Sequence, residues 1–121
     1  MNGKKWLQLN RIDNLLISTH AREKMLDSTN YMPSLDMCQE YLDNAQYQTI
    51  GEIYKLGFAP NYVGRKLKNI ESFYFLFKIE HVDLIAVIQK KVSSRDFDAV
   101  WVTTLYHDKE SLKRKQRRNP E

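Results

Sequence analysis

The chain contains very little cysteine, glycine or proline. Among its 121 residues are one Cys, four Gly and three Pro. A single cysteine excludes an intramolecular disulfide, and we expect Cys38 to pack as a small buried hydrophobe in a reducing cytoplasm. So few glycines and prolines are not typical of a linker or a low-complexity chain. With 42% hydrophobic residues, the composition instead predicts one folded domain over residues 1–108.

Long hydrophobic runs and cofactor motifs are also absent. The most apolar stretch, residues 73–88, is interrupted by charged side chains, so we expect no membrane span. Polar residues break up the first 16 positions, and no signal peptide is predicted. The histidines and the cysteine lack the spacing of metal ligands, and the glycines are isolated. We therefore expect no metal site, no glycine-rich phosphate loop and no bound cofactor.

The positive charge of the chain is concentrated at its C-terminus. Residues 1–108 hold 13 Lys/Arg and 13 Asp/Glu, whereas residues 109–121 hold six Lys/Arg and two Asp/Glu. A basic tail of this kind favours polyanions such as RNA, although a solvated terminus is the alternative interpretation. The tail side chains that we expect to contact phosphates are Lys113, Arg114, Lys115, Arg117 and Arg118.

Hydrophobic patterns predict helices in the first half of the chain and strands in the second. Residues 1–16 match neither period and suit a short helix or an extended arm. Helices are predicted at residues 19–28, capped by Ser18 or Thr19, and after the cap Ser34 to about residue 44. Strands are predicted at residues 49–54, 62–67, 72–79, 84–89 and 99–106, with residues 80–83 as a hairpin connection and residues 92–96 as a polar loop. This order predicts an α+β domain, with two N-terminal helices packed on one face of an antiparallel sheet of about four or five strands.

The most informative motif lies at the start of the first of these two helices. His20 and Lys24 are four residues apart, so they share a helix face, whereas Arg22 lies on another side. At most two of these three groups can therefore point at one ligand from the helix alone. The strand at residues 101–107 adds hydroxyl groups and a further imidazole.

These segments resemble a group of small bacterial and phage domains of uncharacterised function, which are similar to RelE and barnase-like ribonuclease toxins. The matching residues are the His-Ala-Arg helix start at 20–22, Met25, and the closing Val-Thr-Thr-Leu-Tyr strand at 102–106. The chain departs from the family pattern at residues 26–32, where a neutral-to-acidic turn replaces an arginine and a small residue. The resemblance implies a RelE-like fold and a toxin that acts alone or is held by a partner antitoxin. A phage or mobile-element accessory protein is a separate expectation.

The resemblance further implies RNA cleavage without a metal ion, in which the ribose 2′-hydroxyl attacks the adjacent phosphorus. Histidine suits both proton transfers of this reaction, and cations stabilise the charge on phosphorus. The residues that would serve are His20 as acid or base, Tyr106 or His107 as the second proton carrier, and Arg22 and Lys24 as phosphate clamps. Arg65, Lys66 and Lys68 are further phosphate-binding candidates.

Structural roles are the alternative for each of these residues. His20 could cap its helix or pack on the sheet, Tyr106 could be an ordinary sheet aromatic, and His107 could lie on the surface after the last strand. The cations at residues 65–68 could protect a sheet edge. The competing functions are accordingly a non-catalytic RNA- or protein-binding module of the same fold, or an accessory protein whose sheet edge recruits a host protein.

Overall fold

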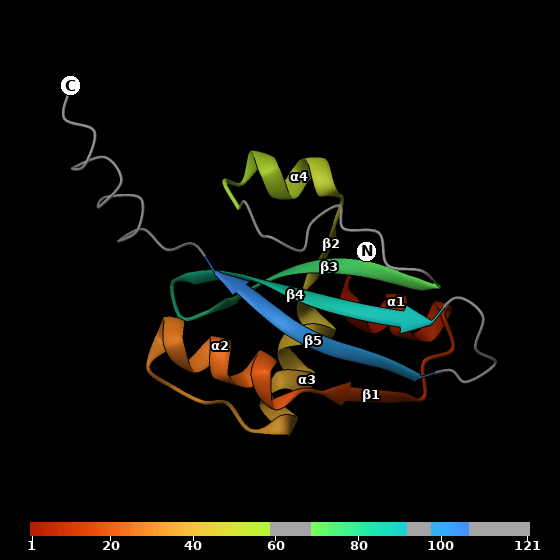
Figure 1. The fold of residues 1–121 in the computed structure, drawn as a ribbon, viewed down its shortest axis with the longest axis horizontal. Helices are drawn as coiled ribbons and strands as arrows, with labels where there is room; N and C mark the ends of the chain where they lie inside the picture. Colours follow the sequence, from red (N-terminus) through yellow and green to blue (C-terminus); the bar gives the residue numbers. More distant parts are fainter. Residues whose placement is uncertain (59–68, 92–97, 107–121) are drawn as a thin grey trace.

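The helices lie mainly in the first half of the chain and the long strands in the second half, and together they assemble into an α+β fold (Figure 1). The computed structural model describes residues 1–58, 69–91 and 98–106. In chain order the elements are α1 (Gly3–Leu9), β1 (Asn14–Ile17), α2 (Thr19–Thr29), α3 (Leu35–Asn44), β2 (Gln46–Gln48), α4 (Ile50–Lys55), β3 (Ile70–Ile79), β4 (Val82–Lys91) and β5 (Asp98–Tyr106). The predicted α+β class is confirmed. The strand expected at residues 62–67 and the loop expected at residues 92–96 lie outside the described residues.

The long hairpin of β3 and β4 forms the centre of the sheet. Its two strands pair from Ile70 with Lys91 to Ile79 with Val82, and apolar side chains pack against each other across the pair. The turn is shorter than the expected residues 80–83: it is made by two residues, and Glu80 adopts a positive φ of 56°. The predicted hairpin is therefore confirmed with a tighter connection.

The sheet has five strands in the order β1-β5-β4-β3-β2. All neighbouring strands are antiparallel except β1 and β5, which pair in parallel from Asn14 with Asp98 to Ile17 with Trp101. The sheet is thus mixed rather than wholly antiparallel as expected. Four-residue β1 is too short to show a strand period, and its partner lies at the other end of the chain.

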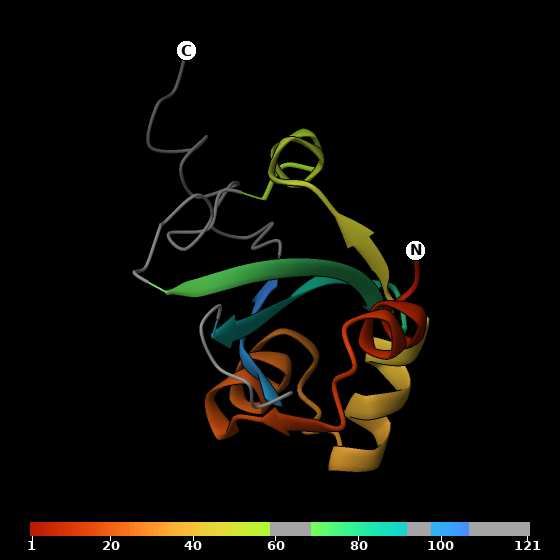
Figure 2. The same cartoon turned by 90° about the vertical axis from the view of Figure 1, so that its right-hand side faces the viewer.

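The two predicted helices, α2 and α3, pack on one face of the sheet as expected, and the additional helix α4 covers the other face. Figure 2 shows α1, α2 and α3 on one side and α4 on the other. On the first side they bury a large core that includes Trp6, Leu7, Ala21, Met25, Cys38, Leu42, Phe75, Phe77 and Trp101. On the second side α4 contributes to a small core made of Ile53, Phe58, Tyr74, Ile85 and Val87. Both faces of the central strands therefore carry apolar residues, which is why their hydrophobic runs are almost continuous.

The prediction of a strand at residues 49–54 was wrong, because this segment forms α4. The hydroxyl of Thr49 accepts a hydrogen bond from the backbone N–H of Glu52 at 3.2 Å, and the Glu52 carboxylate accepts one from the Thr49 N–H at 3.1 Å. This reciprocal capping box satisfies two backbone donors at the helix start. These hydrogen bonds also lower the pKa of Glu52. The capping pair outweighs the β-branched residues that suggested a strand.

Close backbone contact holds α1 against α3. The N–H of Gly3 donates to the carbonyl oxygen of Ala45 at 2.8 Å, and a Cβ atom on Gly3 would overlap the carbonyl oxygen of Leu42. Only glycine fits this approach, which lets Trp6 and Leu7 reach the large core. The segment at residues 1–16 therefore contains a short helix followed by the beginning of a strand, so both expected conformations occur within it.

Candidate functional site

The start of α2 is fixed to the last strand of the sheet by Ser18. Its hydroxyl accepts the backbone N–H of Ala21 at 3.0 Å as the helix cap, and it donates to the carbonyl oxygen of Val102 at 2.9 Å. The backbone N–H of Ser18 also donates to the carbonyl oxygen of Trp101 at 3.1 Å. Ala21 and Met25 are fully buried beneath the helix. The first turn of α2 is therefore held in place from both the cap and the core.

His20 and Lys24 stand on this fixed turn, and together with the Ser18 anchor we call them the α2 site. His20 is the second residue of the helix and is exposed, and Lys24 is half-buried one turn later. Within the described residues, no hydrogen bond or ion pair engages either side chain. The first turn of α2 holds no acidic residue, so the positive end of the helix dipole is uncompensated and favours an anion.

Arg22 has a structural contact that distinguishes it from its neighbours. Its Nε donates to the carbonyl oxygen of Pro33 at 3.0 Å, which ties α2 to the segment before α3. Arg22 also lies close to the buried Cys38. Burial raises the pKa of that thiol to about 11, and the nearby guanidinium lowers it by a smaller amount. The expectation that Cys38 is buried is confirmed.

Tyr106 lies on the same side of the sheet as α2 but further along β5. It is half-buried against the large core and pairs with Leu84 in the sheet register. Tyr106 is four positions along β5 from Val102, where Ser18 is anchored. Four positions correspond to about 13 Å at the usual rise per residue of a strand. Figure 1 shows α2 and β5 running in the same direction from that anchor. His20 and Tyr106 thus share a side of the sheet, and no hydrogen bond between described residues joins them.

The other predicted site residues lie outside the described part of the chain. They are His107, Arg65, Lys66, Lys68, Lys113, Arg114, Lys115, Arg117 and Arg118. The described residues hold nine Lys/Arg and eleven Asp/Glu, whereas the whole chain carries a net charge of +4. The positive excess on which RNA binding would depend is therefore contributed by the undescribed segments.

Two further properties of the described residues concern metal binding and the membrane. Within them, no cluster of three or more His, Cys, Asp or Glu side chains is arranged to hold a metal ion. None of their helices is long and apolar enough to cross a bilayer.

No family model, no curated protein and no solved structure matches the chain. The only clues to its function are therefore its own sequence and the geometry of its side chains.

A second surface feature was missed by the sequence interpretation. A groove of about 360 Å³ lies between α3 and the end of β3, and we call it the α3 groove. It is lined by Met37, Glu40, Tyr41, Asn44, Phe77 and Lys78. The residues on α3 recur at helical spacing, which is the signal that could have suggested a shared face. Their proximity to residues 77 and 78 depends on the tertiary packing and has no local signature.

Proposed function

We propose that this domain binds RNA and cleaves it without a metal ion, in the manner of the RelE-like toxins that it resembles. One observation supports the proposal above all: the exposed His20 stands on a helix turn that Ser18 anchors to β5. General acid–base catalysis needs a proton carrier that is accessible and held in one position. His20 is accessible, and the backbone that carries it is held by the Ser18 anchor.

In the proposed reaction the 2′-hydroxyl of a ribose attacks the neighbouring phosphorus and expels the 5′-oxygen of the next nucleotide. One group removes the proton of the 2′-hydroxyl, and another donates a proton to the departing oxygen, leaving a 2′,3′-cyclic phosphate. His20 performs one of these transfers, and Tyr106 or His107 performs the other. Lys24 lies one turn from His20 and stabilises the negative charge on the phosphoryl oxygens.

The test compares His20→Ala with His81→Ala on a structured RNA in the presence of EDTA. His81 is exposed in the turn between β3 and β4, so its replacement is a matched control for loss of an imidazole. We expect His20→Ala to lower the cleavage rate by about 100-fold or more and His81→Ala to leave it unchanged. Equal rates in the wild type and both variants would refute the catalytic role of His20.

A second measurement tests the electrostatic part of the proposal. Removing residues 109–121 removes six Lys/Arg, so the affinity for single-stranded RNA should fall. The slope of log affinity against log salt concentration should also become shallower, by up to about 4 if every cation neutralises one phosphate. An unchanged slope would show that the tail does not contact the RNA.

The alternative function is a non-catalytic module of the same fold that binds RNA or protein. The contact of Arg22 with the Pro33 carbonyl oxygen favours it, because a predicted phosphate clamp is already engaged in holding the fold. RNA binding without cleavage in the EDTA assay would support this alternative. For either function we propose a cytoplasmic location, since a free, buried cysteine needs no oxidising compartment. For the ribonuclease we also propose a partner antitoxin, as in the toxins that the chain resembles.

A further inference from the structure

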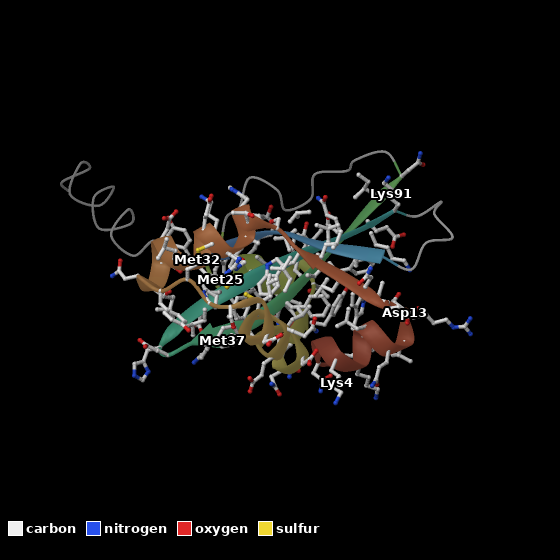
Figure 3. All side chains as sticks on the ribbon, turned by 90° about the horizontal axis from the view of Figure 1, so that it is seen from below. Lys4, Asp13, Met25, Met32, Met37 and Lys91 are labelled. Carbon is white, nitrogen blue, oxygen red and sulfur yellow. The ribbon has the colours of Figure 1, made fainter. Side chains whose placement is uncertain are left out.

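The α3 groove is formed by one face of α3 and the end of β3. Met37, Tyr41 and Asn44 recur along the helix at spacings of four and three residues, so they line one side. Phe77 and Lys78 line the other side. Figure 3 places Met37 at the end of the molecule where α2 and α3 meet, and Lys91 at the opposite end. None of the residues that line the groove belongs to α2.

Aromatic and sulfur-containing side chains make the groove apolar. The ring of Tyr41 stacks on that of Phe77 with 5.9 Å between centroids and 27° between planes. The hydroxyl of Tyr31 donates to Sδ of Met37 at 2.9 Å, which joins the segment before α3 to the groove. Tyr31 is 45% exposed, and Met37 is half-buried. Large apolar side chains that are clustered and exposed in this way are typical of a binding surface.

The rim of the groove is acidic. Glu40 of α3 lines the groove, and α3 contains no Lys or Arg. Glu80 follows β3 in the hairpin turn, and both Glu40 and Glu80 lie close enough to Tyr41 to add to the increase in its pKa that burial mainly causes. The lysine that lines the groove forms an ion pair with Asp83 of β4 at 3.6 Å. Among the described residues, no ion pair engages Glu40 or Glu80, so these two carboxylates give the rim its negative charge.

We propose that the α3 groove is the docking surface for a basic, apolar segment of a partner protein. The segment places a large apolar side chain between Met37 and Tyr41, and its Lys or Arg side chains face Glu40 and Glu80. Charge complementarity selects this occupant, because an acidic rim repels RNA and attracts a cationic peptide. Methionine and tyrosine suit the role, since one adapts its shape and the other supplies rigid contact area.

The size of the groove agrees with a peptide segment as the occupant. Its volume of about 360 Å³ is at the small end of the usual range for ligand pockets, about 300–1,000 Å³. That space accommodates one or two side chains, with the flanking residues of the segment lying along α3. This inference is independent of the proposed function, because the groove contains neither His20 nor Lys24.

The direct test is a titration of the full-length ¹⁵N-labelled protein with a short synthetic peptide in which Leu and Phe lie between Arg residues. We expect changes in amide chemical shift that are confined to residues 37–44 and 77–80. Two control peptides are matched in length: one has Glu at every Arg position, and the other keeps the Arg residues but replaces Leu and Phe by Gly. No shift changes with the basic, apolar peptide at about 1 mM, or equal changes with either control, would overturn the proposal.

Charge variants provide the second arm of the test. The double substitution Glu40→Gln with Glu80→Gln should weaken peptide binding by about three- to tenfold. The matched control, Glu23→Gln with Glu71→Gln, removes the same charge from exposed positions on α2 and on the far end of β3. Equal losses in the two double variants would show unspecific attraction and would contradict a site at the groove.

Other occupants are distinguished in the same experiments. Self-association of the wild type that Met37→Lys abolishes would assign the groove to a second copy of the chain. Displacement of the peptide by RNA would assign it to nucleic acid, and tighter peptide binding after removal of residues 109–121 would assign it to the chain's own basic tail. Each of these results overturns the partner proposal. Cleavage or RNA binding measured on the Glu40→Gln, Glu80→Gln variant reports separately on the proposed function.

Discussion

The α2 site and the α3 groove have opposite chemistry on one small domain. The α2 site is polar, with an exposed imidazole and an ammonium group at a helix start that has no acidic residue in its first turn. The α3 groove is aromatic and is rimmed by carboxylates. This difference is consistent with the two partners proposed above, a polyanion at the α2 site and a basic segment at the α3 groove. The two surfaces are joined through the large core and through the contact of Arg22 with Pro33.

Two methionines give the largest expected contrast between a residue that holds the fold and one that serves a surface. Met25 is fully buried beneath α2, whereas Met37 is half-buried in the α3 groove. We expect Met25→Ala to lower the free energy of unfolding by about 2–5 kcal/mol, because it leaves a cavity. Met37→Ala should lower it by less than about 1 kcal/mol. Urea denaturation measures both values, and equal losses would contradict a surface role for Met37.

The dependence of the free energy of unfolding on alkaline pH tests the burial of Cys38, which lies in the large core beneath both surfaces. Burial raises the pKa of its thiol to about 11, whereas a thiol in the unfolded chain has a pKa of about 8.5. Below about pH 8.5 both states keep the proton, and above it unfolding releases the proton. The free energy of unfolding should therefore fall as pH rises toward 11, by on the order of 2 kcal/mol. Denaturation of Cys38→Ala at the same pH values should lack this component, and parallel curves for the two proteins would contradict it.

Two serine caps compare the anchoring of α2 with that of α3. Ser34 caps α3 by accepting the N–H of Met37 at 3.2 Å, whereas Ser18 caps α2 and also donates to Val102 at 2.9 Å. We expect Ser34→Ala to cost about 1 kcal/mol and Ser18→Ala to cost about 1–2 kcal/mol. Thermal denaturation measures the two costs. Ser18→Ala should also slow RNA cleavage, since it loosens the turn that carries His20, and an unchanged rate would separate the anchor from the activity.

The smallest expected effects separate Arg22 from Lys24. Arg22→Lys removes the hydrogen bond from Nε to the Pro33 carbonyl oxygen while keeping the charge, so it should cost about 1 kcal/mol of stability. Lys24→Gln should leave stability within about 0.5 kcal/mol. In RNA binding the order should reverse, because only Lys24→Gln removes a cation. Filter binding at fixed salt measures this, and a larger loss for Arg22→Lys would place the guanidinium at the phosphate.

The elements that could be predicted are those with local signals. Ser18 and Ser34 mark the starts of α2 and α3. Apolar runs rich in β-branched and aromatic residues mark β3 and β4. The segment after Thr49 was assigned to a strand because its capping pair with Glu52 was weighed less than its β-branched residues. Strand β1 has only four residues, so no period is visible in it. Short elements take their conformation from partners that are distant in sequence.

The candidate site was only partly predictable for the same reason. Helical spacing alone placed His20 and Lys24 on one face and Arg22 on another. The engagement of Arg22 by Pro33 depends on the path of the chain between α2 and α3, which the sequence pattern does not describe. The α3 groove likewise requires residues 37–44 to meet residues 77 and 78. The sequence thus predicts which side chains share a face of one helix, but it does not predict which side chains of different elements meet.

The anchor of α2 on β5 has a consequence for the growing chain during translation. Ser18, whose hydroxyl donates the hydrogen bond, and Val102, whose carbonyl oxygen accepts it, are 84 residues apart. In the described part of the chain, β1 likewise pairs with residues 98–101. A nascent chain that ends before Val102 has neither contact, so the turn that carries His20 lacks its support. The ribosome therefore completes almost the whole domain before the α2 site is assembled. An activity directed at RNA would be withheld during synthesis by the topology alone.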